Sequence, residues 1–191
     1  MSQESSKLRI MIITALFAAI IGILAQVSIP LPFTSVPMTG QTLAIGLTAT
    51  ILGSRIGTIA TFLYIIIGLA GVPVFAQFKA GFGVLFGPTG GFIIGFIPTV
   101  FLIGLYLEKL SFSFINAFIA NIMGMFITLT FGTVWLKIVS DLTWTAAFIG
   151  GFAPFIIIGI IKALLAAWLG ITIRERLIHA NLLIRLKKQV E

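Results

Sequence analysis

Long apolar segments alternate with short polar or glycine-rich breaks along the chain. A helix that crosses the hydrocarbon core of a bilayer needs about 20 mostly apolar residues, and fewer suffice where other protein surrounds its ends. The pattern therefore predicts an all-α integral membrane protein with six transmembrane helices. The expected helices cover about residues 8–27, 39–52, 55–69, 90–107, 114–139 and 146–173.

The breaks between these segments differ in character. The second and third expected helices are short and meet at a polar turn, Gly53-Ser54-Arg55. The stretch from Gly71 to Gly91 is unlike a linker, because it holds four phenylalanines and a lysine among six glycines. Loops of this length are usually functional or disordered, and so many large apolar residues argue against disorder. We interpret the stretch as an outer lid over a pocket for a small molecule.

The composition agrees with a chain embedded in lipid. Hydrophobic residues make up 59% of the 191 residues and charged residues 9%, against about 25% charged residues in soluble domains. This excludes a soluble enzyme, a disordered linker and a nucleic-acid-binding domain, and it predicts one membrane domain over residues 1–191. Cysteine is absent and His179 is the single histidine. We therefore expect no catalytic residue, no metal site and no cofactor.

The basic residues predict the orientation in the membrane. With six helices, both termini share one side with the loops at Arg55 and Lys109, and that side carries nine Lys and Arg residues. The other side carries two, Lys79 and Lys137. Because cytoplasmic loops are enriched in Lys and Arg, we expect both termini in the cytoplasm and the glycine-rich loop outside. The remaining residues counted on the cytoplasmic side are Lys7, Arg9, Arg174, Arg176, Arg185, Lys187 and Lys188.

Lys162 is the one clear case of a charged residue deep inside an expected span. Such a charge is costly in a bilayer and points to function, and its helical neighbours Gly159 and Ala166 are small enough to leave room for a ligand. Asn121 and Thr128 share a face of the fifth expected helix, and we interpret them as partners in hydrogen bonds between helices.

The sequence holds no evident source of energy for transport. All five acidic residues lie in expected loops or tails, so an intramembrane carboxylate relay is missing. No lysine is followed by Ser or Thr, so a phosphate-binding loop cannot be placed. Ala15 and Ala19 form a small-residue pair on the first helix, where the backbone of a partner could approach closely.

Several motifs resemble those of one known family. In the lid these are Gly71-Val-Pro-Val-Phe75 and Gly87-Pro-Thr-Gly-Gly-Phe92 followed by Gly95-Phe96. Elsewhere they are Val36-Pro-Met-Thr-Gly-Gln41-Thr, Tyr64 with Gly68, Gly151 with Pro154-Phe155, and Lys162-Ala163. Together they resemble the signature of the BioY family, the biotin-specific membrane subunits of energy-coupling factor (ECF) transporters. The resemblance runs from about residue 15 to about residue 170.

The resemblance implies a multi-pass protein of the bacterial cytoplasmic membrane that binds biotin near its outer face. It also implies a transmembrane coupling protein and two ATPase subunits as partners, with Ala15 and Ala19 matching the motif that docks on the coupling protein. Gly159 stands where many members carry an aspartate. The ligand-binding residues that we expect are Gln41, Tyr64, Phe75, Lys79, Phe82, Gly87, Phe92, Gly159 and Lys162.

The chemistry of biotin suggests how the two lysines divide their roles. Biotin has a bicyclic urea and a flexible chain that ends in a carboxylate, so its pocket needs apolar walls, a few hydrogen-bond partners and a cation. We expect Lys162, deep in the span, to meet the ring, and Lys79 to pair with the carboxylate while Phe75 and Phe82 cover the ligand. Three alternatives stay open: a related subunit for another small vitamin or carboxylate, a stand-alone carrier or channel, and an intramembrane scaffold without transport activity.

Overall fold

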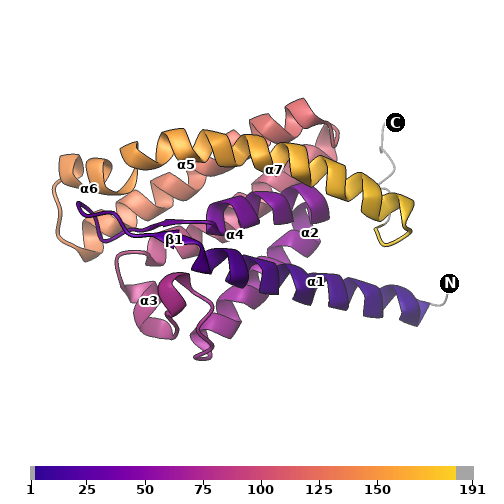
Figure 1. Cartoon of the computed structure of the whole chain (residues 1–191), viewed down its shortest axis with the longest axis horizontal. Helices are drawn as coiled ribbons and strands as arrows, with labels where there is room; N and C mark the ends of the chain where they lie inside the picture. Colours follow the sequence, from indigo (N-terminus) through magenta and orange to yellow (C-terminus); the bar gives the residue numbers. More distant parts are fainter. Residues whose placement is uncertain (1–2, 184–191) are drawn as a thin grey trace.

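The computed structural model describes residues 3–183, and the expected tail residues Arg185, Lys187 and Lys188 lie outside this range. The long helices are α1 (Gln3–Gln26), α2 (Gln41–Leu69), α4 (Gly90–Lys109), α5 (Phe114–Val139) and α7 (Ala153–His179). Shorter elements connect them at one end of the bundle (Figure 1). These are the antiparallel strands β1 (Ser28–Ile29) and β2 (Met38–Thr39), a 3-10 turn η1 (Ala76–Phe78), α3 (Phe82–Phe86) and α6 (Trp144–Gly151).

The element α2 is two helices folded back on each other. Gly53 has φ 80° and ψ −171°, a backbone conformation that is essentially restricted to glycine. The side-chain amide of Gln41 donates a hydrogen bond of 2.6 Å to the hydroxyl of Tyr64, 23 residues further on. In a straight helix these residues would lie about 34 Å apart. The predicted turn at Gly53 is therefore present.

Five helical segments of the described chain are long and apolar enough to cross a membrane, and α2 is counted as one of them. Because α2 folds back at Gly53, the described chain has six candidate spans, which is the predicted number. The start of α1 and the end of α7 lie at the same end of the bundle, where the guanidinium of Arg9 donates to the backbone carbonyl of Asn181 (Figure 1). The glycine-rich loop lies at the opposite end.

The prediction of one continuous helix over 146–173 was wrong. The helix is interrupted at Phe152, between α6 and α7. Pro154 in the first turn of α7 lacks an N–H, so it cannot continue a preceding helix. The helix α7 then extends to His179, so Arg174 lies in a helix instead of a tail. Its guanidinium is buried, donates to the carbonyl of Ile51 and lies 3.6 Å from the centre of the Phe112 ring.

A carboxylate holds the Gly53 turn against the end of α4. Glu108, expected in a loop, lies inside α4 and accepts hydrogen bonds of 2.7 Å from both the backbone N–H and the hydroxyl of Ser54. A Cβ atom at position 53 would collide with this carboxylate. The turn therefore depends on glycine twice, for its backbone angles and for the space that Glu108 occupies.

We expect Gly53→Ala to lower the melting temperature of the purified protein, because an L-residue is strained at this φ and the Glu108 contact is displaced. The loss should be at least about 1–2 kcal/mol of unfolding free energy. Gly83→Ala is the matched control, since Gly83 has no heavy atom near an added Cβ and no positive φ. Equal melting of both variants would contradict this account of the turn.

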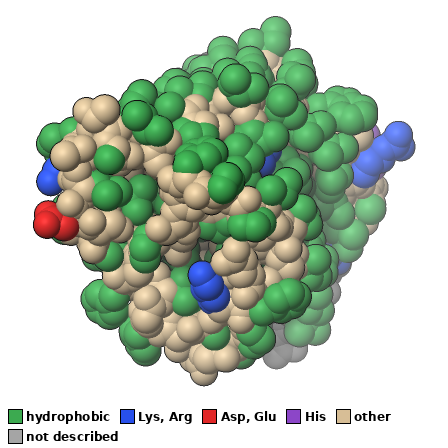
Figure 2. Space-filling model, turned by 60° about the vertical axis from the view of Figure 1, so that its left-hand side comes forward, with side chains coloured by type: hydrophobic (Ala, Val, Ile, Leu, Met, Phe, Trp, Pro, Cys, Tyr) green, Lys and Arg blue, Asp and Glu red, His purple; other side chains and the backbone are tan. Residues whose placement is uncertain are grey.

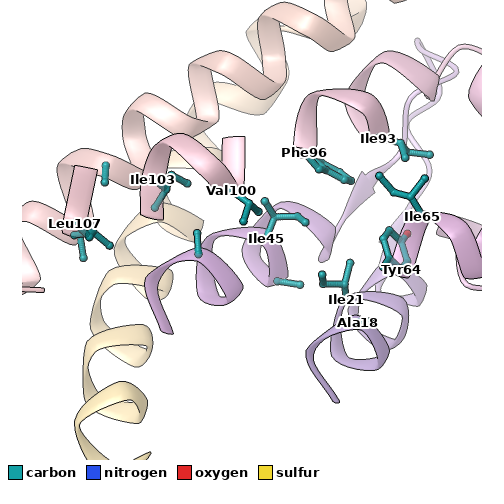
Figure 3. Packing of buried hydrophobic residues seen from close by; sticks show 14 of the residues in the cluster. Ala18, Ile21, Ile45, Tyr64, Ile65, Ile93, Phe96, Val100, Ile103 and Leu107 are labelled. Atoms are coloured by element: carbon teal, nitrogen blue, oxygen red, sulfur yellow. The ribbon is translucent and has the colours of Figure 1, made fainter. Parts of the chain in front are cut away.

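The core lies between α1, α2 and α4 (Figure 3). Ile21 of α1, Ile45 and Tyr64 of the two α2 halves, and Phe96 and Val100 of α4 are almost completely buried there. The helix α1 packs mainly against α2 and η1, so its opposite face is uncovered. A second buried cluster, around Phe92 and Phe155, joins α4, α5 and α7. These two clusters flank the cavity described next.

Candidate ligand-binding cavity

A cavity opens at the end of the bundle that carries the glycine-rich loop. Figure 2 shows this end, where uncharged polar side chains and backbone surround a hollow with a basic side chain beside it, while hydrophobic side chains cover the flanks. The cavity reaches inward between α2, α4, α5 and α7. Its apolar walls include Ile45, Phe75, Phe92, Ile93, Phe96, Leu129, Phe155 and Ile158. Its polar lining includes Thr39, Gln41, Thr42, Gln77, Lys79, Thr89, Thr99, Asn121, Thr128 and Lys162.

Lys162 projects from α7 into this cavity. Its ammonium donates hydrogen bonds to the backbone carbonyl of Thr39 at 2.6 Å and to the hydroxyl of Thr42 at 3.1 Å. An ammonium has three donors, so one N–H is left to face the cavity. None of the described residues that line the cavity is acidic. The positive charge is therefore held by neutral dipoles and is available to a ligand oxygen.

Gln41 and Tyr64 organise one wall. The amide of Gln41 donates to the Tyr64 hydroxyl, its carbonyl oxygen accepts from the hydroxyl of Thr39 at 3.0 Å, and the Tyr64 hydroxyl donates to the carbonyl of Val74 at 3.3 Å. Gln41 lines the cavity, whereas Tyr64 lies behind it. Tyr64 therefore acts as a support that orients Gln41 and fixes the loop.

Phe75 anchors the glycine-rich loop. Its ring is fully buried, lies edge-on to Tyr64 with 5.6 Å between ring centres, and still contributes to the cavity wall. Gln26 of α1 fastens the same segment, since its amide donates to the carbonyls of Val74 and Phe75 and its oxygen accepts from the N–H of Phe78. Gln26 was not among the residues expected at the site, although a lone glutamine at the end of an apolar helix indicates a polar contact there.

The other expected residues of the loop divide between the cavity and its surroundings. Lys79 is exposed and lines the mouth, and its carbonyl accepts from the N–H of Phe75 at 3.0 Å. Phe82 is 64% exposed and does not line the cavity. Gly87 also lies outside it, where its carbonyl accepts from the indole N–H of Trp135 at 3.1 Å.

Gly159 and Phe92, two of the residues predicted to bind the ligand, both line the cavity. The sulfur of Met125 packs into the space that a side chain at position 159 would occupy. The polar residues at the inner end of the cavity were not expected as part of the site, because Asn121 and Thr128 were interpreted only as partners in hydrogen bonds between helices. They do have that role: Asn121 donates to Thr50 at 3.0 Å, and the hydroxyls of Thr128 and Thr99 lie 2.8 Å apart. Asn121, Thr99 and Thr128 nonetheless line the cavity as well.

The fold and the cavity define a class: a multi-pass helical membrane protein with a ligand cavity at one end. Residues 1–179 match the sequence profile of the BioY family. The chain is 42% identical over 178 residues to the biotin transporter BioY2 of Lactococcus lactis subsp. cremoris, covering 93% of this chain and 97% of the relative. It is 38% identical over 169 residues to the biotin transporter BioY of Thermotoga maritima, covering 88% and 97%.

A solved structure has the same fold. The crystal structure of the S-component for biotin from an ECF-type ABC transporter superposes with a TM-score of 0.84 at 29% identity, over 92% of this chain and 95% of that chain. The chain belongs to the BioY family. The family and this structural neighbour are transporter components and not enzymes, as the sequence analysis expects.

Proposed function

We propose that this chain is the subunit that captures biotin at the outer face of the bacterial cytoplasmic membrane and delivers it inward with an ECF coupling module. The module consists of a transmembrane coupling protein and two ATPase subunits. The observation that carries the proposal is Lys162, an intramembrane cation without an acidic partner among the described residues, at an apolar cavity with one N–H unused. The names of the relatives and of the structural neighbour support biotin as the ligand.

The test is mass spectrometry of small molecules released when the purified protein is denatured. Biotin, in a molar amount close to that of the protein, is the expected result. Another vitamin or carboxylate would indicate a related subunit, and an empty protein that takes up no biotin on titration would favour a scaffold. Uptake of biotin in cells that lack the coupling protein would favour a stand-alone carrier.

The mouth of the cavity supports a role for Lys79 in pairing with the ligand carboxylate. Lys79 is the cation in the described lining at the outer end, and the loop that carries it is fastened by Gln26 and Phe75. The other lysine expected on this side, Lys137, lies outside the lining, with its ammonium 5.4 Å from the centre of the Trp144 ring. We retain Phe75 as part of the ligand cover, whereas Phe82 would have to turn inward to contribute.

Lys79→Ala should weaken biotin binding by about 1.4- to fivefold, since exposed ion pairs typically contribute about 0.2–1 kcal/mol. The methyl ester of biotin, which lacks the carboxylate charge, should bind equally well to wild type and variant. Isothermal titration calorimetry measures both, with Lys137→Ala as the control that changes neither. Equal weakening for biotin and its ester, or no weakening of either, would exclude the charge pairing.

A further inference from the structure

Asn121 presents an unused hydrogen-bond acceptor at the inner end of the cavity. The side chain is 5% exposed and lines the cavity. Its Nδ2 group donates to the hydroxyl of Thr50 at 3.0 Å and to the carbonyl of Ala117 at 2.8 Å, which uses both amide hydrogens. No donor among the described residues is hydrogen-bonded to Oδ1. A buried amide whose donors are both satisfied and whose acceptor is not leaves that acceptor for another molecule.

Glycine at position 46 makes room for this oxygen beside the first half of α2. Oδ1 lies against Gly46, which also lines the cavity, and a Cβ atom at position 46 would collide with it. Gly46 follows Thr42 by one helical turn, and its position lies beside Ala166, one turn inward of Lys162. The oxygen of Asn121, beside Gly46, therefore lies inward of Thr42, whose hydroxyl accepts from the ammonium of Lys162.

A ligand with a urea group needs both kinds of partner. The urea oxygen accepts, and Lys162 supplies a donor, but lysine has no acceptor for the two urea N–H groups. Among the other side-chain acceptors of the inner cavity, the Gln41 oxygen already accepts from Thr39 and the Thr42 hydroxyl from Lys162. The hydroxyls of Thr99 and Thr128 share one hydrogen bond, and Thr99 also donates to the carbonyl of Gly124, so the acceptors of this pair are hydroxyl oxygens and not amide oxygens. Gly159 brings no acceptor either, and Met125 sulfur fills the space beside it. Asn121 Oδ1 is the strong acceptor that is left in this set.

We propose that Asn121 Oδ1 accepts a hydrogen bond from one urea N–H of the bound ligand, while Lys162 donates to the urea oxygen. This assigns Asn121 as a specificity-determining residue and deepens the proposed function, on which it rests. A urea group carries one acceptor and two donors, so it can bond to a donor and to an acceptor at different depths of the cavity. Ligands without an N–H at this point leave the buried oxygen unpaired and bind more weakly.

The test pairs a protein variant with a ligand variant. Affinities for biotin and for its two N-methylated urea derivatives are measured by calorimetry on wild type and on Asn121→Ala. Wild type should discriminate against one of the two derivatives by at least about tenfold, because a methyl group replaces the N–H and meets Asn121. Asn121→Ala should bind biotin at least about fivefold more weakly and discriminate against that derivative by less than about twofold.

Two outcomes overturn the assignment. One is wild type binding both methylated derivatives as tightly as biotin, which requires no variant to fold. The other is an Asn121→Ala variant that discriminates against the methylated derivative as strongly as wild type does. The affinity losses from the substitution and from methylation would then be independent, which means that Asn121 and the methylated nitrogen do not interact. Thr50→Val controls for the structural role of Asn121, because it removes an acceptor of Nδ2 and leaves Oδ1 in place. Its biotin affinity should stay within about twofold of wild type.

The same measurements separate this assignment from the proposed function. If wild type binds no biotin, the proposed function fails and the assignment fails with it. If wild type binds biotin and Asn121→Ala binds it equally well, the assignment fails while biotin capture stands. A control on the same helix is Asn116→Ala. It removes a side-chain amide that bonds to Ser111 and lies outside the described lining of the cavity, so the affinity for biotin should not change.

Discussion

Replacement of Lys162 by methionine should weaken biotin binding by about 10- to 150-fold without preventing folding. A hydrogen bond from a charged donor contributes about 1.5–3 kcal/mol, and every 1.4 kcal/mol is a factor of ten in affinity. Methionine has a similar length and keeps the cavity filled, so the change removes the ammonium and little else. Calorimetry with purified protein gives the affinity directly.

The folding stability of Lys162→Met should rise or stay unchanged, although its affinity for biotin falls. A charged side chain inside a span costs about 2.5–3.5 kcal/mol on insertion scales, and Lys162 has only neutral partners in Thr39 and Thr42. Removing the charge therefore relieves a cost that the empty protein bears. Thr42→Val is the control, because it takes one acceptor from the ammonium and leaves the charge at the cavity. Unchanged affinity in Lys162→Met, or a large drop in melting temperature, would show that the lysine is structural.

The sequence predicted the helices well because their cause is local. Every span must bury its backbone polar groups in lipid, so length and hydropathy alone identify it. The Gly53 turn was also predictable, since polar residues and glycine interrupt the apolar pattern there. The break at Phe152 was missed because no charged or strongly polar residue interrupts the apolar pattern there, and only Gly150-Gly151 and Pro154 mark it.

The site was less predictable, because it depends on contacts between distant segments. Lys162 stood out as a charge in an apolar helix, and its place in the cavity needed no further information. Asn121 did not stand out, because an intramembrane amide usually serves helix packing, and only the position of Gly46 and Thr50 shows which of its atoms is left unused. Arg174 was assigned to the tail by charge counting. Counting charges cannot detect that its guanidinium donates a hydrogen bond to the carbonyl of Ile51.

The second large effect that we expect comes from substitutions on the exposed side of α1. Ala15 and Ala19 lie on its exposed side, one turn apart, while Phe17, Ala18 and Ile21 face the core. The helix packs mainly on α2 and η1, and Ile12, Leu16 and Ile23 are also exposed. Small side chains let the backbone of a second helix approach closely, and in a bilayer such packing contributes much of the association energy.

Ala15→Trp and Ala19→Trp should each prevent assembly with the coupling protein and the ATPase subunits while leaving biotin binding unchanged. The indole holds the two backbones apart at the docking face, but neither position lines the ligand cavity. The measurement is co-purification of the tagged subunit with its co-expressed partners, with biotin affinity determined on the same preparations. Ala146→Trp is the matched control, because Ala146 is also exposed but lies in α6, at the end of the bundle with the cavity mouth. Recovery of the partners at wild-type yield with either α1 variant would rule out this face as the docking surface, whereas loss of partners in all three variants would show that tryptophan disrupts assembly without regard to position.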